Sequence, residues 1–148
     1  MPLDLLSQPE LAAEGTDRRE AILIIDDDEA MTEVLSRRLR QQGFETLAAN
    51  SGAAGLALAQ SQEPDLIVLD LRLPDTDGFT LCQRLVDSPN TCHIPVIILS
   101  GMERPDIIRR SRAAGCSFFV RKPYDPNALL VLIRQALRER EAWAQPEA

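Results

Sequence analysis

Short apolar runs recur along this sequence, and each is followed by a segment with helical features. The five runs occupy residues 21–25, 44–49, 66–69, 96–99 and 117–120. Short runs that are apolar on both faces, such as 21–25, are typical of strands in a parallel sheet, because helices then bury both sides of that sheet. The alternation therefore predicts an α/β fold.

The segments between the runs carry the start, stop and spacing signals of helices. They occupy residues 29–42, 51–60, 79–86 and 105–114, and a fifth begins near Pro126. In the first, Leu35 and Leu39 recur at helical spacing and Gly43 supplies the stop. Asn50 or Ser51 caps the second. Because parallel strands need right-handed crossovers, this order predicts a five-stranded parallel sheet with five helices covering its two faces.

One domain accounts for nearly all of the chain. Its 148 residues, 45% of them apolar, suffice for one well-filled core. We expect this domain over residues 21–142, with tails at 1–20 and 143–148. The first tail is expected to be flexible, although its leucines leave open a short docked helix as the alternative.

Charge and hydropathy argue against two classes of partner. A net charge of −7 and a sequence pI near 4.7 disfavour direct binding to nucleic acid or to an anionic membrane, because like charges repel. No apolar run is long enough for membrane insertion, and the first residues lack the pattern of a signal peptide. Together with three widely separated cysteines, these features predict a cytoplasmic protein with free thiols.

Polar side chains follow four of the predicted strands. Asp26 and Asp27 follow the first, Asp70 the third, Ser100 the fourth, and Lys122 comes just after the fifth. In open parallel sheets, ligands bind beyond the carboxyl ends of the strands. We therefore expect these side chains to meet in one cleft.

The chemistry of this cleft follows from its carboxylates. Asp26, Asp27 and Asp70 would repel one another unless a cation neutralised them, and oxygen ligands suit magnesium, with manganese as an alternative. Beside such a cation, a carboxylate can attack a phosphoryl group. Asp70 is the best nucleophile, because it ends an apolar strand that holds its backbone rigidly.

Lys122 is the only lysine in a chain that has fifteen arginines among its sixteen basic residues. A compact ammonium on a flexible stem can stabilise a phosphoryl oxygen, and it can pair with Asp70 when the site is empty. Pro123 favours a cis peptide that would aim the lysine into the cleft. Ser100 adds a hydroxyl donor.

Other patterns in the sequence admit simpler interpretations. Asp28 and Glu29 are expected to begin a helix rather than to bind metal. The segment 75–78 resembles the start of a calcium loop and a phosphatase signature, but it lacks the flanking residues that either motif needs. Cys92 and His93 have no second ligand pair at metal-site spacing, so we expect a loop there.

The same residues carry a family resemblance over roughly 22–140. The segments ILIIDDD (22–28), DLIVLDLRLPDTDG (65–78) and VRKP (120–123) resemble the main signatures of bacterial response regulator receiver domains, in particular stand-alone, chemotaxis-regulator-like ones. The resemblance implies a flavodoxin-like, doubly wound sheet with strand order 2-1-3-4-5. It also implies magnesium held by Asp26, Asp27, Asp70 and the backbone carbonyl of Arg72.

The resemblance further implies a signalling switch in a two-component system, rather than a turnover enzyme. Asp70 would accept a phosphoryl group from a phosphohistidine on a sensor histidine kinase or a phosphotransfer protein, and hydrolysis would reset it. Inward movement of Ser100 and Phe119 would then reshape the surface of the fourth and fifth helices. That surface would bind a downstream protein or, with the fifth strand, form a homodimer. Phe119 lacks the hydroxyl of the tyrosine that is common at this position.

Two residues are expected to set the lifetime of the phosphorylated form. Arg72 lies two positions after Asp70 and Met102 two after Ser100, so both should flank the attacking water and slow hydrolysis. The rival interpretation is a receiver-like module that binds partners without phosphorylation. The complete set of acids, serine and lysine favours the switch. A phosphatase is disfavoured because the chain offers no pocket for a small phosphate ester and no second carboxylate suitably placed as a general acid.

Overall fold

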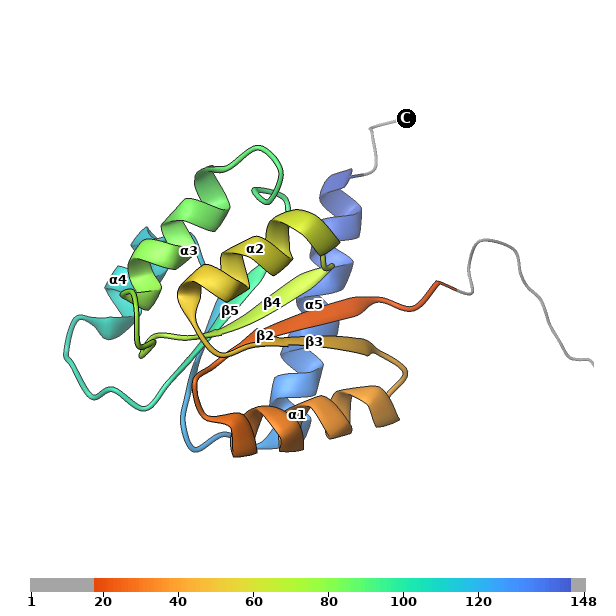
Figure 1. The fold of residues 1–148 in the computed structure, drawn as a ribbon, viewed down its shortest axis with the longest axis horizontal. Coiled ribbons are helices and arrows are strands. Elements are labelled where there is room, and N and C mark those ends of the chain that lie inside the picture. Colours follow the sequence, from red (N-terminus) through yellow and green to blue (C-terminus); the bar gives the residue numbers. More distant parts are fainter. Residues whose placement is uncertain (1–17, 145–148) are drawn as a thin grey trace, which may run out of the picture.

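Five parallel strands form one sheet in the computed structural model, which describes residues 18–144 (Figure 1). The strands are β2 (Ala21–Ile25), β3 (Glu45–Ala49), β4 (Leu66–Asp70), β5 (Val96–Ser100) and β6 (Phe118–Arg121). The helices are α1 (Glu29–Gln41), α2 (Gly52–Gln62), α3 (Gly78–Asp87), α4 (Ile107–Ala113) and α5 (Pro126–Ala144). The alternation of strands and helices matches the prediction from the sequence.

The strands lie side by side in the order β3-β2-β4-β5-β6, and every pair is parallel. Counted along the chain this is 2-1-3-4-5, which confirms the expected doubly wound topology. The chain runs outward in opposite directions from β2 and β4, which pair in register with Ile24 opposite Val68. Such a switch point opens a crevice at the carboxyl ends of the two strands.

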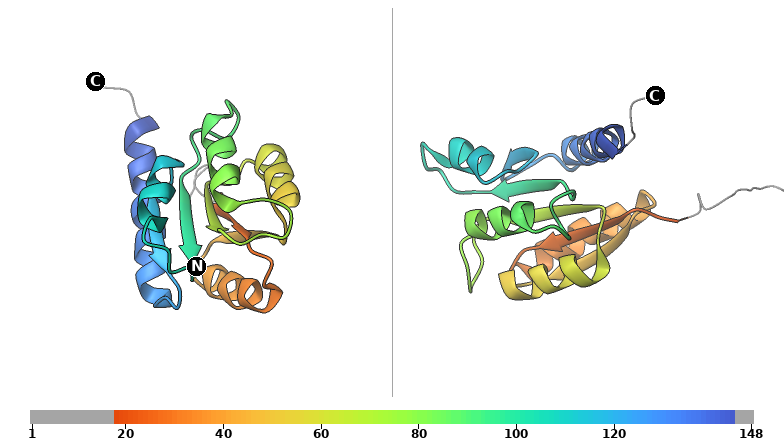
Figure 2. Two further views of the ribbon diagram at one scale, coloured as in Figure 1. Left: turned by 90° about the vertical axis from the view of Figure 1, so that its left-hand side faces the viewer. Right: turned by 90° about the horizontal axis from the view of Figure 1, so that it is seen from above.

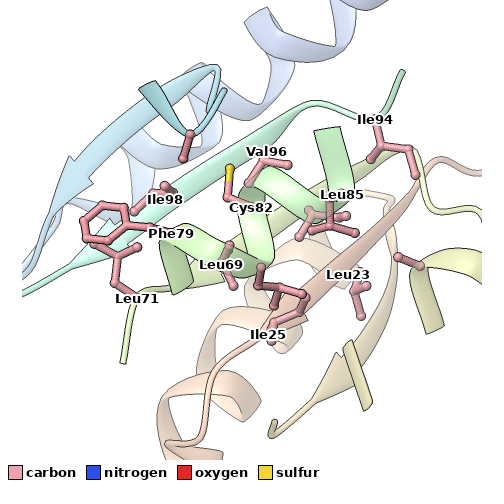
Figure 3. Close-up of a cluster of buried hydrophobic side chains, with 14 of the residues drawn as sticks. Leu23, Ile25, Leu69, Leu71, Phe79, Cys82, Leu85, Ile94, Val96 and Ile98 are labelled. Atoms are coloured by element: carbon pink, nitrogen blue, oxygen red, sulfur yellow. The ribbon is translucent and has the colours of Figure 1, made fainter. Parts of the chain in front are cut away.

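Alternating side chains of the strands pack into two apolar cores, one on each face of the sheet. Leu23, Leu69 and Ile98 face α2, α3 and α4 (Figure 3). Ile24 and Val68 face α1 and α5. Figure 2 shows the strands between α5 on one side and the α2–α3 pair on the other. The middle strands β4 and β5 are buried along their whole length, as their apolar sequences require.

Side-chain caps set where the first three helices begin. Asp28 caps α1 by accepting a hydrogen bond from the Met31 amide at 3.2 Å, as expected. Ser51, not Asn50, caps α2. α4 begins two residues later than predicted, because the Ile107 amide bonds back to the Arg104 carbonyl in a turn at 3.2 Å.

The described residues, 18–144, begin and end inside the two predicted tails. Residues 1–17, which carry most of the predicted N-terminal tail, lie outside the described residues, as do residues 145–148. Helix α5 continues to Ala144, two residues into the predicted C-terminal tail. None of the helices within residues 18–144 is both long and apolar enough to cross a membrane.

A buried carboxylate at the amino-terminal edge of the sheet joins both ends of the described chain. Asp65 accepts hydrogen bonds from the Ala21 amide at 2.8 Å and from Arg140 of α5 at 3.0 Å, and Arg18 lies 3.3 Å away. Burial alone would raise the pKa of Asp65, but these hydrogen bonds and the two positive charges outweigh it and lower the pKa.

Replacing this carboxylate should reduce stability in a pH-dependent way. We expect Asp65→Asn to lower the free energy of unfolding by about 2 kcal/mol at neutral pH, because it loses charge-assisted hydrogen bonds. The lowered pKa makes this contribution complete above the unfolded pKa of about 3.9, and it disappears as the pH falls through the lower folded value. Urea unfolding at neutral and acidic pH measures the difference. Asp87→Asn is the control, and equal losses at both pH values would contradict the prediction.

Candidate functional site

Three carboxylates meet at the carboxyl ends of β2 and β4, as predicted from the sequence. Asp26 and Asp27 follow β2, and Asp70 is the last residue of β4. Each offers one oxygen, and these three oxygens lie within 4.8 Å of one another. Asp26 and Asp70 are buried, whereas Asp27 is exposed. The cluster therefore lies at the switch point of the sheet and is open to solvent on the side of Asp27.

Lys122 reaches into this cluster from the end of β6. Its Nζ lies 3.3 Å from Oδ2 of Asp26 and 3.3 Å from Oδ2 of Asp70. The Lys122 amide donates a hydrogen bond to the Ser100 carbonyl at 2.8 Å, which continues the pairing of β5 and β6 up to the site. The peptide bond between Lys122 and Pro123 is cis, the form that the proline made us expect. The lysine thus bridges the two buried carboxylates.

Each buried carboxylate has one oxygen held by the backbone and the other turned toward the ammonium. Oδ1 of Asp26 accepts a hydrogen bond from the Asp28 amide at 2.9 Å, and Oδ1 of Asp70 accepts one from the Arg72 amide at 3.2 Å. Both are bonds to an amide two residues further along. These turns fix the carboxylates before any ligand binds, which reduces the reorganisation that binding requires.

The charges in the site shift two pKa values. Burial raises the pKa of Asp26, and the neighbouring Asp70 carboxylate adds to the increase, while the Asp28 amide and Lys122 oppose it. Burial would lower the pKa of Lys122, but the Asp70 and Asp26 carboxylates raise it further than burial lowers it. Lys122 is therefore held as an ammonium, facing a surplus of negative charge.

The donor set fits a hard divalent cation. Three carboxylate oxygens within 4.8 Å of one another are the ligands that magnesium and manganese prefer, and the exposed side of the cluster leaves room for retained water. One ammonium only partly balances three carboxylates. A divalent cation would relieve the remaining repulsion, so Asp26, Asp27 and Asp70 are the residues that would hold it.

The other predicted site residues lie on neighbouring strands. Ser100 ends β5 and is fully buried, and its Oγ accepts a hydrogen bond from the Met102 amide at 3.0 Å. Phe119 lies in the middle of β6, half-buried, and packs against the core beneath α3 and α4. The guanidinium of Arg121 lies 5.9 Å from the centre of its ring. Arg72 is exposed at the start of the loop that follows β4.

The loop of residues 71–77, which connects Asp70 to α3, is held more tightly than the sequence suggested. Arg72 and Asp77 face each other in an antiparallel bridge, and the Gly78 amide donates to the Leu71 carbonyl at 3.0 Å. A Cβ on Gly78 would lie 2.5 Å from the Leu71 Cα, so only glycine allows this approach. Asp77 caps α3, as a turn entering this helix requires.

Two residues near the site were not identified from the sequence. Thr32 of α1 is buried beside a small cavity that Asp26, Asp70 and Lys122 also line, and its hydroxyl has no hydrogen-bond partner within residues 18–144. Asp75 accepts hydrogen bonds from the Gly52 and Ala53 amides at 2.7 and 2.9 Å, which lowers its pKa. It thereby caps α2 from a distant segment, and no local pattern signals such a contact.

A doubly wound parallel sheet with an acidic cluster and one lysine at its switch point defines a class of α/β signalling domains. The family model of the response regulator receiver domain matches residues 22–134. The chain belongs to this family.

Curated relatives share the domain but are longer. The DNA-binding dual master transcriptional regulator RpaA of Synechocystis sp. is 39% identical over 124 residues, which are 84% of this chain and 52% of that protein. The response regulator PleD of Caulobacter vibrioides is 38% identical over 118 residues, which are 79% of this chain and 26% of that protein. The chain thus spans about half, or less, of the length of these two curated relatives.

Solved receiver domains match over their whole length. A CheY-like receiver domain protein from Methanospirillum hungatei has a TM-score of 0.81 and 28% identity, covering 86% of this chain and 100% of its own. The receiver domain of a signal transduction histidine kinase from Syntrophus aciditrophicus has a TM-score of 0.77 and 29% identity, covering 87% and 96%. Both comparisons support the topology described above.

Magnesium should stabilise the folded domain through this cluster. A cation at about 100 times its Kd raises the free energy of unfolding by about 2.7 kcal/mol. We expect the midpoint of thermal unfolding to rise with Mg²⁺ in the wild type and to rise less in Asp27→Asn, which removes the exposed ligand. Glu33→Gln, an exposed carboxylate on α1, is the control. Equal Mg²⁺ responses in wild type and Asp27→Asn would contradict this ligand set.

Proposed function

We propose that this domain is a phosphorylation-dependent switch in which Asp70 accepts the phosphoryl group. The observation that supports this role is the position of the Asp70 carboxylate. It lies 3.3 Å from the Lys122 ammonium and has an oxygen within 4.8 Å of oxygens of Asp26 and Asp27. Asp26 has the same ammonium contact and the same acidic neighbours, but Asp70 is the last residue of strand β4, so the sheet holds its backbone.

The transfer forms one bond and breaks another. An oxygen of Asp70 attacks the phosphorus of a phosphohistidine on the donor protein and becomes part of an acyl phosphate. The phosphorus–nitrogen bond breaks, and its electron pair stays on the imidazole nitrogen of the donor. Lys122 balances the charge that builds on the phosphoryl oxygens. Hydrolysis of the acyl phosphate by water later restores Asp70.

A divalent cation held by Asp26, Asp27, Asp70 and the Arg72 carbonyl would supply additional positive charge to the transferring group. The chain's own residues do the positioning. Amides of Asp28 and Arg72 fix the carboxylates, and Lys122 is held between them. The domain would thus catalyse its own phosphorylation and also its own dephosphorylation, which would be slow. It would not be a turnover enzyme.

The switch would operate through the residues that surround the acceptor. Ser100 lies at the end of β5 next to Asp70 on β4, because Asp70 pairs with Leu99 in the sheet. Movement of the Ser100 hydroxyl toward a phosphoryl group, with the half-buried Phe119 following inward, would change the face formed by α4, β6 and α5. A domain with two such arrangements responds by a shift in their populations.

The partners of the switch are proteins. A sensor histidine kinase or a phosphotransfer protein would donate the phosphoryl group, and a downstream protein, or a second copy of the domain, would bind the face formed by α4, β6 and α5. The net charge of −7 disfavours direct contact with nucleic acid. A cytoplasmic location, where such partners act, remains the prediction from the sequence.

Phosphorylation of Asp70 can be tested with a small-molecule donor. Incubation with acetyl phosphate and Mg²⁺ should add the mass of one phosphoryl group to the intact protein, and Asp70→Asn should abolish the addition. Lys122→Ala should slow it strongly, because the developing charge loses its partner. Asp87→Asn, a carboxylate at the far end of α3, should behave as wild type. An unmodified wild-type protein that still binds a partner would instead support the phosphorylation-independent module.

The lifetime of the acyl phosphate should depend on Arg72 and Met102. The Met102 amide bonds to Ser100, and Arg72 follows Asp70 by two residues, so we expect both side chains to flank the side from which water would attack. We expect the double variant Arg72→Ala, Met102→Ala to lose its phosphoryl group faster, as followed by intact mass over time. Arg84→Ala on α3 controls for the loss of an exposed arginine. An unchanged half-life would count against this role.

A further inference from the structure

One side chain of α4 contacts the segment that leads from Asp70 into α3. The guanidinium of Arg110 lies over the ring of Phe79, 4.3 Å from its centre. A nitrogen of the same group lies 4.0 Å from Oδ2 of Asp77. Phe79 itself is buried and packs near Leu71, at the start of the connecting loop (Figure 3). Arg110 therefore links α4 to Asp77, the last residue of the loop of residues 71–77, and to Phe79 in the first turn of α3.

The contact at Asp77 continues to Asp70 through hydrogen bonds and an antiparallel bridge. The other oxygen of Asp77 accepts a hydrogen bond from the Phe79 amide at 2.9 Å and so fixes the start of α3. Asp77 faces Arg72 in the antiparallel bridge. The Arg72 amide in turn donates to Asp70 at 3.2 Å. A contiguous path of contacts therefore runs from Arg110 to Asp70.

Helix α4 has few other contacts that hold it in this place. It is only seven residues long, and Asp106, before its first residue, makes no side-chain cap hydrogen bond. Only Ile107 and Ser111 of this helix are buried. The buried Ser111 hydroxyl has no hydrogen-bond partner within residues 18–144, which is unfavourable for a buried polar group. A short helix with an unpaired buried hydroxyl is held only weakly, so α4 is suited to a second position relative to the rest of the domain.

Arginine has the chemistry that both contacts need. Its planar guanidinium can lie on an aromatic ring and point a nitrogen at a carboxylate at the same time, whereas the ammonium of lysine acts as a point charge. Neither contact is strong alone, because Arg110 and Asp77 are both partly exposed to solvent. Together they select one placement of α4 relative to the loop.

We propose that Arg110 is a positioning residue that couples α4 to the cation and phosphoryl site. By holding Asp77 and Phe79, it favours the loop geometry in which the Arg72 amide bonds to Asp70. Binding at the site and docking of α4 then stabilise one another, because coupling between two sites is reciprocal. This inference rests on the proposed function, since it assigns the regulation of the same site.

The first test compares Mg²⁺ affinity in two single variants. Arg110→Met keeps an unbranched, flexible stem but removes the charge and the planar group, and we expect it to weaken Mg²⁺ binding by about fivefold in calorimetry, at the lower end of typical allosteric couplings. Arg109→Met removes the neighbouring, exposed arginine of the same helix and should bind Mg²⁺ as the wild type does. Arg110→Lys should be intermediate, because it keeps only the charge.

The second test follows α4 directly by hydrogen exchange. Mg²⁺ with beryllofluoride should slow exchange of the amides in residues 107–113 of the wild type and of Arg109→Met, and this protection should be lost in Arg110→Met. Measured unfolding free energies of the three proteins separate this local change from a general loss of stability. A purely structural role would alter stability without altering the response of α4.

The outcomes distinguish the inference from the proposed function. If the wild type binds Mg²⁺ and Arg110→Met shows the same affinity and the same protection of α4, the coupling role is wrong and the phosphoacceptor role stands. If the wild type binds neither Mg²⁺ nor beryllofluoride, both are wrong. Weaker binding confined to Arg110→Met, with partial rescue by Arg110→Lys, supports the coupling.

Discussion

The concentration of negative charge at one edge of the sheet is the constraint on which the rest of the site depends. Asp26 and Asp70 are buried within reach of each other, and burial together with the second carboxylate raises the pKa of Asp26. Lys122 contacts both at 3.3 Å and reduces the cost of keeping them charged. A single ammonium leaves a surplus of negative charge, which further positive charge would relieve. The fold thus holds Asp70 in a site whose negative charge is only partly balanced.

Much of the fold could be predicted because its determinants are local in the sequence. Apolar runs identified the strands, and the rule that ligands gather at carboxyl ends placed Asp26, Asp27, Asp70, Ser100 and Lys122 at one edge. The structure places all five there. Their chemical roles are supported by this geometry and by the membership in the receiver family, and they remain proposals.

The features that the sequence did not reveal depend on contacts between distant segments. Asp75 caps a helix that begins 23 residues earlier. Asp65 contacts Ala21 and Arg18 near one end of the domain and Arg140 near the other. Arg110 is one of several arginines in α4, and its place over Phe79, which follows from the packing of α4 on α3, distinguishes it from the others. Choices between adjacent residues, such as Asn50 or Ser51 as a cap, also need backbone geometry that composition does not encode.

The network around Asp65 has a consequence for how the domain can be joined to other polypeptide. It ties the start of β2 and the last turns of α5 together at the edge of the sheet opposite the acid cluster, with Glu20 also 3.9 Å from Arg140. A connection made at either terminus of the described region would therefore leave from the side remote from the acceptor. Such a layout leaves the acid cluster clear of any attached polypeptide, which suits a domain found in proteins of differing overall length.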